Sequence, residues 1–430
     1  MDDGASYRIK MAFFGLVLLL LIDIYAYQAI RIATSKFQVI PKVVARTLYW
    51  SVTAFAVFIL IWINTIGIAD EKLKQWVIVV LGIVYFSKTF LVLVLLVDDI
   101  RRGRHYVKRY YGNKKQPRGT DADVRISRSE FFARAALVSW TIPMVPLSFG
   151  IISGAHNFQV RRKTVYLPNL PNAFDGVTIG QLSDIHAGSL FNKTAIRGGV
   201  DMLLQEKPDV IFFTGDLVNV ETREVNDYIN VFDKLNAPLG VFSVTGNHDY
   251  GNYRKWPSEA AKRQNILDMI SAHKHLGYTL LMNESRMLEQ GGEKIAIVGV
   301  ENWGIGPPLR FPKYGKLKEA NANTEDAVVK ILLSHDPTHW DAQIRPEFPD
   351  IDLTFAGHTH GYQMGVTLGD YTWSPAQYRF KQWAGLYQEG NQYLYVNRGF
   401  GCVGYPGRIG MPPELTIIEL KRGVNTEERL

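Results

Sequence analysis

The sequence predicts an N-terminal region of four transmembrane helices, followed by an α/β domain of two stacked β-sheets flanked by helices. Two observations favour this fold class. Long apolar runs are confined to the part before about residue 155, whereas short strand-like runs alternate with helical patterns over residues 156–430. The length of 430 residues also favours two domains. We therefore expect a membrane region at residues 1–155 and a separate domain at residues 156–430.

Four segments of the first region are long and apolar enough to cross a bilayer, whose core takes about 20 mostly apolar residues per helix. They are residues 11–29, 47–69, 76–97 and 135–153. Buried helices of a soluble domain are the alternative, but four such runs within 155 residues disfavour it. Further spans follow the first run, and no small-residue cleavage site ends it, so we expect a helix there and not a signal peptide.

Loop charge predicts the orientation of these spans. A strongly basic loop covers residues 98–134, and the link between the first two spans is basic as well. The positive-inside rule places both links in the cytoplasm. The sequence therefore predicts a multi-pass protein of the cytoplasmic membrane whose second domain is extracytoplasmic. Arg161, Arg162 and Lys163, just beyond the fourth span, argue against that orientation.

Two ionisable residues lie inside the predicted spans. Asp23 and Lys88 each fall twelve positions after the apolar start of their run, and the first and third helices run in the same direction. An unpaired charge at that depth costs about 2.5–3.5 kcal/mol on insertion scales. We therefore expect an ion pair between Asp23 and Lys88 that fixes the packing of these helices. A proton or ion pathway is the alternative interpretation.

The net charge of +7 is unevenly distributed. Residues 1–155 carry 20 Lys and Arg against 10 Asp and Glu, and residues 156–430 carry 28 against 31. The mildly acidic second domain lacks the basic surface typical of proteins that bind a long phosphate backbone, so a nucleic-acid partner is disfavoured. The single cysteine, Cys402, excludes an intrachain disulfide and a zinc site built from several thiolates.

Polar clusters follow five short apolar runs of the second domain. These runs are Val177–Leu182, Val210–Phe213, Val241–Val244, Val328–Leu333 and Ile351–Phe355. Helical patterns lie between them at about residues 193–206, 221–235 and 258–276. Strands that alternate with crossover helices form sheets flanked by helices, and ligands gather outside the carboxyl ends of such strands. We therefore expect the five clusters to meet at one site.

The clusters are rich in His, Asp and Gly. They are Ser183-Asp184-Ile185-His186, Thr214-Gly215-Asp216, Thr245-Gly246-Asn247-His248-Asp249, Ser334-His335-Asp336 and Ala356-Gly357-His358-Thr359-His360. Imidazole nitrogens, carboxylates and an amide carbonyl suit manganese, iron or zinc. The candidate ligands are too many for one ion and suit two divalent metal ions that share a carboxylate.

This series resembles the calcineurin-like metallophosphoesterase superfamily over roughly residues 165–420. Within that superfamily it is similar to the bacterial membrane-associated branch, which includes phosphodiesterases related to UDP-diacylglucosamine pyrophosphatases. The stretch Asn397-Arg398-Gly399-Phe400-Gly401 strengthens this narrower match. The resemblance implies a metal-dependent hydrolase of phosphodiester or pyrophosphate bonds.

The resemblance also implies a role for each matching residue. One metal ion would be held by Asp184, His186 and His360, and the other by Asn247, His335 and His358, with Asp216 bridging both. His248 would stabilise or protonate the leaving oxygen, and Asp249 would orient its ring. Two positions depart from the family pattern: Asn219 stands where a second Asp is frequent, and Tyr362 stands where Gly is frequent, beside the entry to the metals.

Aromatic residues mixed with Arg and Lys are frequent between Gly361 and Asn397, which suits a membrane interface or a loop that caps the domain. Arg398 and Arg408 lie in a glycine-rich region and are candidates to clamp a phosphate, or form surface ion pairs. Together, tethering and aromatic residues predict a phosphorylated amphiphile or another small phosphodiester as substrate. A lipid A precursor fits the family but conflicts with an extracytoplasmic domain, because that precursor is made in the cytoplasm. The alternative functions are a non-catalytic receptor that regulates the membrane helices and a nuclease of the same superfamily.

Overall fold

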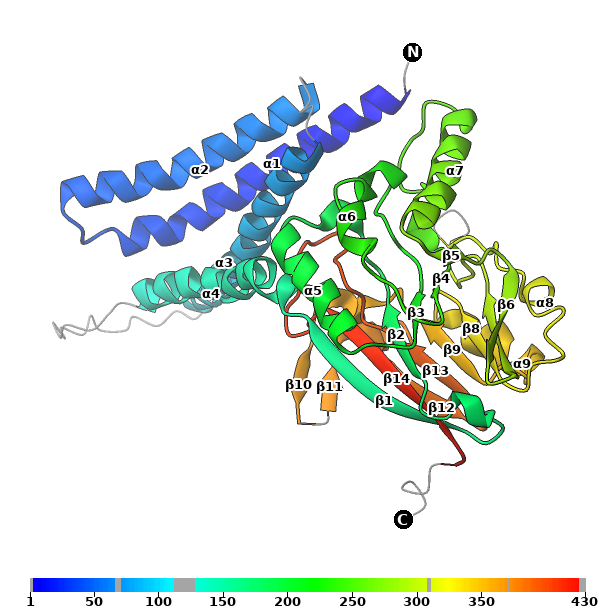
Figure 1. Cartoon of the computed structure of the whole chain (residues 1–430). Helices are drawn as coiled ribbons and strands as arrows, with labels where there is room; N and C mark the ends of the chain where they lie inside the picture. The colour runs from blue at the N-terminus through cyan, green and yellow to red at the C-terminus, as the bar shows by residue number, and fades with distance from the viewer. Residues whose placement is uncertain (1–2, 66–70, 112–127, 308–310, 370, 425–430) are drawn as a thin grey trace. The chain divides into compact units, whose positions relative to one another are not determined.

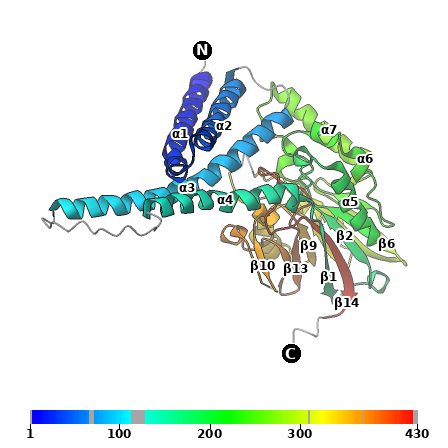
Figure 2. The same cartoon turned by 90° about the vertical axis from the view of Figure 1, so that its left-hand side faces the viewer.

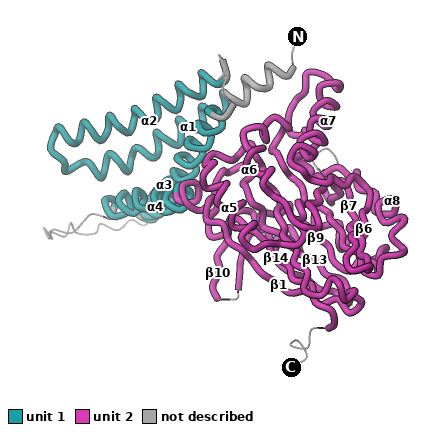
Figure 3. Tube along the Cα trace, viewed as in Figure 1, with its two compact units in different colours: residues 1–148 teal, residues 149–430 magenta. Residues whose placement is uncertain are grey.

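The structure, a computed structural model, describes residues 3–65, 71–111, 128–307, 311–369 and 371–424. The chain divides into two compact units, Met1–Ser148 and Phe149–Leu430 (Figure 3). This division falls a few residues before the boundary expected near residue 155. The reason is that the last turn of the fourth helix hydrogen-bonds within the second unit, where the Arg408 N–H donates to the Gly150 carbonyl over 3.0 Å.

Unit 1 consists of long helices. They are α1 (Asp3–Ala33), α2 (Val39–Thr65), α3 (Glu71–Tyr111) and α4 (Arg128–Ile152), whose last residues belong to unit 2. Among the described residues these four helices are long and apolar enough to cross a membrane, so this prediction is confirmed. The expected basic loop at 98–134 is partly helical, because α3 continues to Tyr111. No proline interrupts that extension, and Arg101 pairs with Asp98 one turn away over 2.8 Å.

The ion pair predicted between Asp23 and Lys88 is present. The Lys88 ammonium contacts Oδ1 of Asp23, and both side chains are buried. The Tyr85 hydroxyl donates to Oδ2 of Asp23 over 2.7 Å, and the Tyr49 hydroxyl lies 2.8 Å from the Asp23 backbone carbonyl and 3.1 Å from its Oδ1. Because Tyr49 belongs to α2 while Tyr85 and Lys88 belong to α3, the carboxylate of Asp23 in α1 joins three helices.

Unit 2 is built around two six-stranded sheets (Figures 1 and 2). The first sheet has the order β1 (Gln159–Leu167), β14 (Glu414–Arg422), β2 (Thr178–Leu182), β3 (Val210–Phe213), β4 (Val241–Ser243) and β5 (Thr279–Leu280). The second sheet has the order β12 (Gly385–Glu389), β13 (Gln392–Val396), β9 (Leu353–Ala356), β8 (Lys330–Leu333), β7 (Glu293–Gly299) and β6 (Glu284–Gln290). A separate hairpin pairs β10 (Val366–Leu368) with β11 (Tyr371–Trp373).

The central strands are continuous apolar runs, which is typical of strands that are buried on both faces of a sheet. Both faces of each large sheet are therefore covered by other layers. Side chains of the two sheets meet in one core, in which the rings of Phe212 in β3 and Phe355 in β9 lie 5.2 Å apart. The other face of the first sheet packs against α5 (Lys193–Gln205) and α7 (Glu259–His275). The other face of the second sheet packs against α8 (Leu317–Ala320) and the turn before α9 (Arg345–Glu347). The predicted α/β fold of two stacked sheets flanked by helices is confirmed.

One predicted helix is wrong. Residues 221–235 form a 3-10 turn at Thr222–Val225 and a short helix, α6 (Ile229–Phe232), in place of one continuous helix. Asn226 and Asp227 separate the two pieces. Both residue types are unfavourable inside helices, because their side chains compete for backbone hydrogen bonds.

The strand directions bring the five polar clusters together. Strands β2, β3 and β4 are parallel neighbours, and so are β8 and β9. Parallel strands end at the same edge of their sheet, and each of the five clusters begins at the carboxyl end of one of these strands. The stacking of the sheets therefore places all five clusters around one site.

Candidate metal centre

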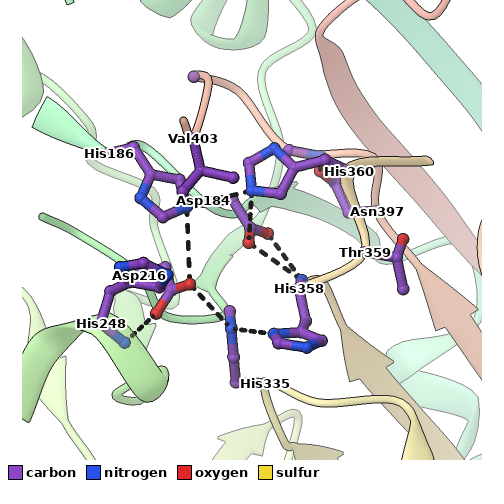
Figure 4. A network of polar contacts seen from close by, with 12 residues as sticks. Asp184, His186, Asp216, His248, His335, His358, Thr359, His360, Asn397 and Val403 are labelled. Carbon is purple, nitrogen blue, oxygen red and sulfur yellow. Dashed lines mark hydrogen bonds and ion pairs between the residues drawn. The ribbon is translucent and has the colours of Figure 1, made fainter. Parts of the chain in front are cut away.

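Two groups of His and Asp side chains face each other at this edge (Figure 4). The first consists of Asp184, His186 and His360, and the second of Asp216, His335 and His358. Within each group one ligand atom per residue lies within 4.8 Å of the others, and all but His358 are fully buried. Six of the seven metal ligands predicted from sequence therefore fall into two adjacent clusters.

The Asp216 carboxylate lies between the clusters. Its Oδ2 atom is 3.1 Å from Nε2 of His335 and 3.6 Å from Nε2 of His186, one residue from each cluster. Its Oδ1 atom accepts the backbone N–H of His248 over 2.8 Å. One oxygen is thus held by the chain while the other faces both clusters, which is the arrangement that a bridging ligand needs.

The rings of His335 and His358 have polar contacts on the side away from the centre. Nδ1 of His335 lies 2.7 Å from the Thr214 carbonyl and donates to it, which leaves Nε2 facing Asp216. Nε2 of His358 lies 3.6 Å from Oδ2 of Asp336, so that Nδ1 faces His335. Ligating histidines are usually oriented in this way by a carbonyl or a carboxylate on the second ring nitrogen.

The seventh predicted ligand, Asn247, tests whether the site fits a cation. Its Nδ2 atom donates to the Tyr253 hydroxyl over 2.6 Å. Its Oδ1 atom is buried and has no hydrogen-bond partner among the described residues. Buried carbonyl oxygens are rarely left without a partner, and this one belongs to a set of oxygen and imidazole donors suited to manganese, iron or zinc. The residues present therefore fit two divalent cations.

Backbone conformation adds a second sign of a specialised site. Asp184, His186, Asp216, His358 and His360 all adopt positive φ, between 48° and 70°. This conformation costs roughly 1–3 kcal/mol for a residue other than glycine, and it persists where surrounding contacts over-determine it. Close packing at the centre also explains why position 246 is a glycine. A Cβ atom on Gly246 would lie 2.2 Å from Oδ1 of Asp216.

The electrostatics of the centre favour positive charge beside Asp216. Burial lowers the pKa of His335, but the Asp216 carboxylate outweighs burial and raises that pKa to about 10. Burial acts to raise the pKa of Asp216, whereas His335 and His248 hold it well below its usual range. The carboxylate therefore stays ionised at the point where the two clusters meet.

The role expected for Asp249 is wrong in one respect, because its carboxylate does not orient the His248 ring. Nδ1 of His248 instead lies 2.7 Å from the backbone carbonyl of Asn219. The Asp249 carboxylate accepts backbone N–H groups from Gly246, Asp216, Leu217 and Val218. It joins the loops after β3 and β4, and burial together with the charge of Asp216 raises the pKa of Asp249 to about 7.

The phosphate clamp expected of Arg398 and Arg408 is also corrected. Arg398 pairs with the buried carboxylate of Glu414 over 2.5 Å. Arg408 is 1% exposed, donates to the carbonyls of Gly399, Gly401 and Met411, and lies 3.3 Å from Nδ1 of His360. Both guanidinium groups have internal partners, so Arg408 supports a proposed ligand and does not face a substrate.

Sequence reasoning missed Tyr253 and Asp336. The Tyr253 ring stacks on the His248 ring at 4.0 Å and 7°, in addition to its contact with Asn247. Asp336 follows His335 directly in one of the polar clusters. This position could have indicated a role beside the metal ligands, but none was predicted for it. Tyr253 lies in an irregular loop after the cluster, and no spacing pattern marks it.

An α/β sandwich with paired His and Asp clusters, preceded by apolar spanning helices, defines a membrane-linked metallophosphoesterase. Family comparison agrees for both parts of the chain. Residues 177–362 match the calcineurin-like phosphoesterase family, and residues 8–155 match a transmembrane domain described as that of a probable calcineurin-like phosphoesterase. This chain belongs to the calcineurin-like metallophosphoesterase family.

Several curated relatives share this similarity. The uncharacterized metallophosphoesterase YkuE of Bacillus subtilis is 30% identical over 273 residues, covering 62% of this chain and 86% of that protein. The transmembrane protein with metallophosphoesterase domain of Danio rerio is 26% identical over 312 residues, covering 71% of this chain and 66%, just under two thirds, of that protein. The phosphodiesterase YaeI of Escherichia coli is 26% identical over 240 residues, covering 56% of this chain and 80% of that protein.

Proposed function

We propose that this chain is a membrane-anchored hydrolase of phosphodiester or pyrophosphate bonds that uses two divalent metal ions. In this proposal one ion is held by Asp184, His186 and His360, and the other by Asn247, His335 and His358, with Asp216 shared. The observation that carries the proposal is the position of Oδ2 of Asp216, within 3.6 Å of ring nitrogens from both clusters. A shared carboxylate oxygen is typical of two-metal sites that act on phosphate esters.

When bound, the ions would supply Lewis acidity and offset the negative charge that develops on the phosphate oxygens. In its protonated form, His248 would then donate the Nε2 proton to the leaving oxygen, while its Nδ1–H stays bonded to the Asn219 carbonyl. The Tyr253 ring on one face of the imidazole and the Asn219 carbonyl at Nδ1 together keep the ring in one orientation.

The substrate we propose is a phosphorylated amphiphile of the membrane. The rings of Phe311 and Phe380 lie 5.5 Å and 5.7 Å from the His358 ring, so an apolar wall adjoins the second cluster. Tyr362, half exposed, extends this wall at 6.1 Å from Phe380. Such a wall suits the non-polar part of a lipid-linked phosphate, which the spanning helices would bring within reach.

A comparison of wild type with His248→Ala tests the proposal. The full chain, purified in detergent and loaded with manganese, should hydrolyse bis-p-nitrophenyl phosphate, and His248→Ala should lower kcat by about 10²–10⁴-fold. His275→Ala is the matched control, because His275 is an exposed histidine of α7. Equal and negligible rates for wild type and His248→Ala would overturn the enzymatic function. Manganese bound without hydrolysis of any lipid or nucleotide phosphodiester would favour a receptor or regulatory domain.

We further propose that the membrane is the cytoplasmic membrane and that unit 2 lies outside the cytoplasm. The support is the basic segment after the third span, which contains Arg101, Arg102 and Arg104 within α3. C-terminal fusions to alkaline phosphatase and to a fluorescent protein report the side directly. Active alkaline phosphatase is expected, and cytoplasmic fluorescence would reverse the orientation.

A further inference from the structure

The hairpin β10–β11, here the residues from Met364 to Trp373, presents apolar side chains to solvent. Val366, Leu368 and Tyr371 are 51%, 72% and 63% exposed. The hairpin forms a sheet of its own, apart from both large sheets of the unit (Figure 1). In the 18 residues between His360 and Arg379 the sequence has one charged side chain, that of Asp370.

An isolated two-stranded sheet of this kind needs a partner. Two strands alone are at best marginally stable in water, and exposed apolar patches mark sites of contact with another surface. The exposed side chains come from both strands, since Leu368 lies opposite Tyr371 and Val366 opposite Trp373. Both strands of the hairpin therefore contribute to one exposed apolar surface.

The base of the hairpin is connected to the end of the last membrane helix by backbone hydrogen bonds within unit 2. The Arg408 N–H donates to the Gly150 carbonyl near the end of α4 over 3.0 Å. The next residue, Ile409, donates to the Gln363 carbonyl over 2.8 Å and accepts the Gly365 N–H over 2.9 Å. Two consecutive residues thus join the helix end to the hairpin base.

The backbone is closely packed at this connection. A Cβ atom on Gly154, just after α4, would lie 2.0 Å from the backbone oxygen of Arg408. A Cβ atom on Gly150 would lie 2.6 Å from the Tyr405 hydroxyl. The hairpin base therefore lies close to the point where the chain leaves its last spanning helix.

We propose that the hairpin β10–β11 lies in the interfacial layer of the bilayer that the helices of this chain span. Three residues per strand reach about 10 Å, which matches the depth of the headgroup region and the upper acyl chains and not a full crossing. Tyr371 and Trp373 are residue types enriched at that level of a membrane. The occupant of the apolar surface is lipid, because the base of this hairpin is joined to the end of a membrane helix.

Contact between the hairpin and lipid would also place the metal centre near the membrane surface, an inference that rests on the proposed function. The hairpin base at Met364 follows His360 by four residues. The hairpin would therefore hold the clusters beside the lipid surface, where the phosphate of an amphiphile lies. Membrane contact and catalysis are measured separately, so the failure of one leaves the other intact.

A fluorescent label on the hairpin tests the contact. Leu368→Cys, labelled with an environment-sensitive dye in the full chain, is placed in phosphatidylcholine nanodiscs with or without doxyl-labelled lipid. Cys402 is buried, so the label is directed to the introduced thiol. A blue-shifted emission, reduced about twofold by doxyl lipid and insensitive to iodide, is expected for an interfacial position.

Val328→Cys is the matched control, because Val328 is 61% exposed and lies before the amino end of β8, away from the clusters. Its label should respond to iodide and not to doxyl lipid. A Leu368 label that behaves like the Val328 label would overturn the proposal. Protection from iodide without doxyl quenching would also overturn it, since protein and not lipid would then cover the hairpin. If Leu368→Cys fails to fold, Tyr371→Cys on the paired strand decides by the same criteria.

Discussion

The Tyr253 hydroxyl accepts a hydrogen bond of 2.6 Å from the side-chain amide of Asn247, while the same Tyr253 ring stacks on His248. One side chain thus holds two neighbouring residues with different proposed roles. An amide group presents either nitrogen or oxygen depending on its rotation. The Tyr253 contact engages the nitrogen, so the oxygen of Asn247 is left for a cation.

Tyr253→Phe should weaken metal binding while it preserves the stacked ring. Loss of the acceptor lets the Asn247 amide rotate, and removal of such a supporting contact typically costs about 10–100-fold in metal affinity. Manganese titration of the full chain measures the effect. Tyr371→Phe, an exposed tyrosine, is the control. Unchanged manganese affinity in Tyr253→Phe would show that the hydroxyl does not position Asn247.

The contacts of Asp249 predict a structural phenotype. In the wild-type chain, backbone N–H groups donate to both carboxylate oxygens of Asp249. Asp249→Asn replaces one of these oxygens with an amide nitrogen, which cannot accept their hydrogen bonds. Hydrogen bonds to charged groups contribute about 1.5–3 kcal/mol each, so we expect a clear loss of thermal stability. Asp326→Asn, on an exposed aspartate, should leave the unfolding temperature unchanged. If Asp249→Asn lowered kcat at an unchanged unfolding temperature, a direct role in catalysis would be favoured instead.

Much of the site was predictable because it follows from strand direction. Clusters such as Gly246-Asn247 and Gly357-His358 each follow a short apolar run, and parallel strands bring such ends together without further information. Tyr253 was not predictable, because its position depends on how a loop folds back over His248. Arg408 was misassigned for a similar reason. The sequence pattern of an arginine near glycines does not distinguish a side chain that binds phosphate from one that donates to three backbone carbonyls.

The fold shows the same division between local and distant information. The apolar runs of β3 and β4 were recognisable because they are buried on both faces. The strands β1 and β14 are harder to recognise, because their apolar residues alternate with polar ones or are interrupted by charged ones. Their pairing also joins segments about 250 residues apart in the sequence, which no local pattern indicates. The interrupted helix at residues 221–235 was overpredicted because the apolar spacing outweighed Asn226 and Asp227.

Buried His273 predicts how stability depends on pH. Burial lowers the pKa of His273 to about 4 in the folded chain, against about 6.5 when unfolded. Below pH 6.5 the unfolded chain therefore binds a proton that the folded chain excludes, and stability falls until pH reaches about 4. The difference of about 2.5 units corresponds to roughly 3 kcal/mol at most.

Chemical unfolding of the full chain between pH 7 and pH 4 checks this expectation. His273→Gln removes the titrating group, so its stability should fall less across this range than that of wild type. His275→Gln, on the exposed histidine two residues away, should retain the wild-type dependence. Parallel curves for wild type and His273→Gln would exclude His273 as the source.

The buried pair of Asp23 and Lys88 predicts strong coupling between two helices. Breaking a buried ion pair by removing one partner costs about 3–5 kcal/mol, because the other charge stays buried without compensation. Asp23→Asn and Lys88→Met should each destabilise the detergent-solubilised chain by about this amount. The double variant should be more stable than either single variant, because neither charge remains and the introduced amide carbonyl at position 23 still accepts from a tyrosine hydroxyl.

A charge swap between Asp23 and Lys88 should recover less than the double variant does. The Tyr85 hydroxyl donates to the carboxylate and the Tyr49 hydroxyl lies 3.1 Å from it, so after the swap both hydroxyl groups would lie beside an ammonium at position 23. A double-mutant cycle on Asp23→Asn and Lys88→Met, measured by thermal unfolding, gives the coupling energy directly. Additive losses would mean that the two charges are stabilised by separate partners, and that the ion pair does not hold α1 against α3.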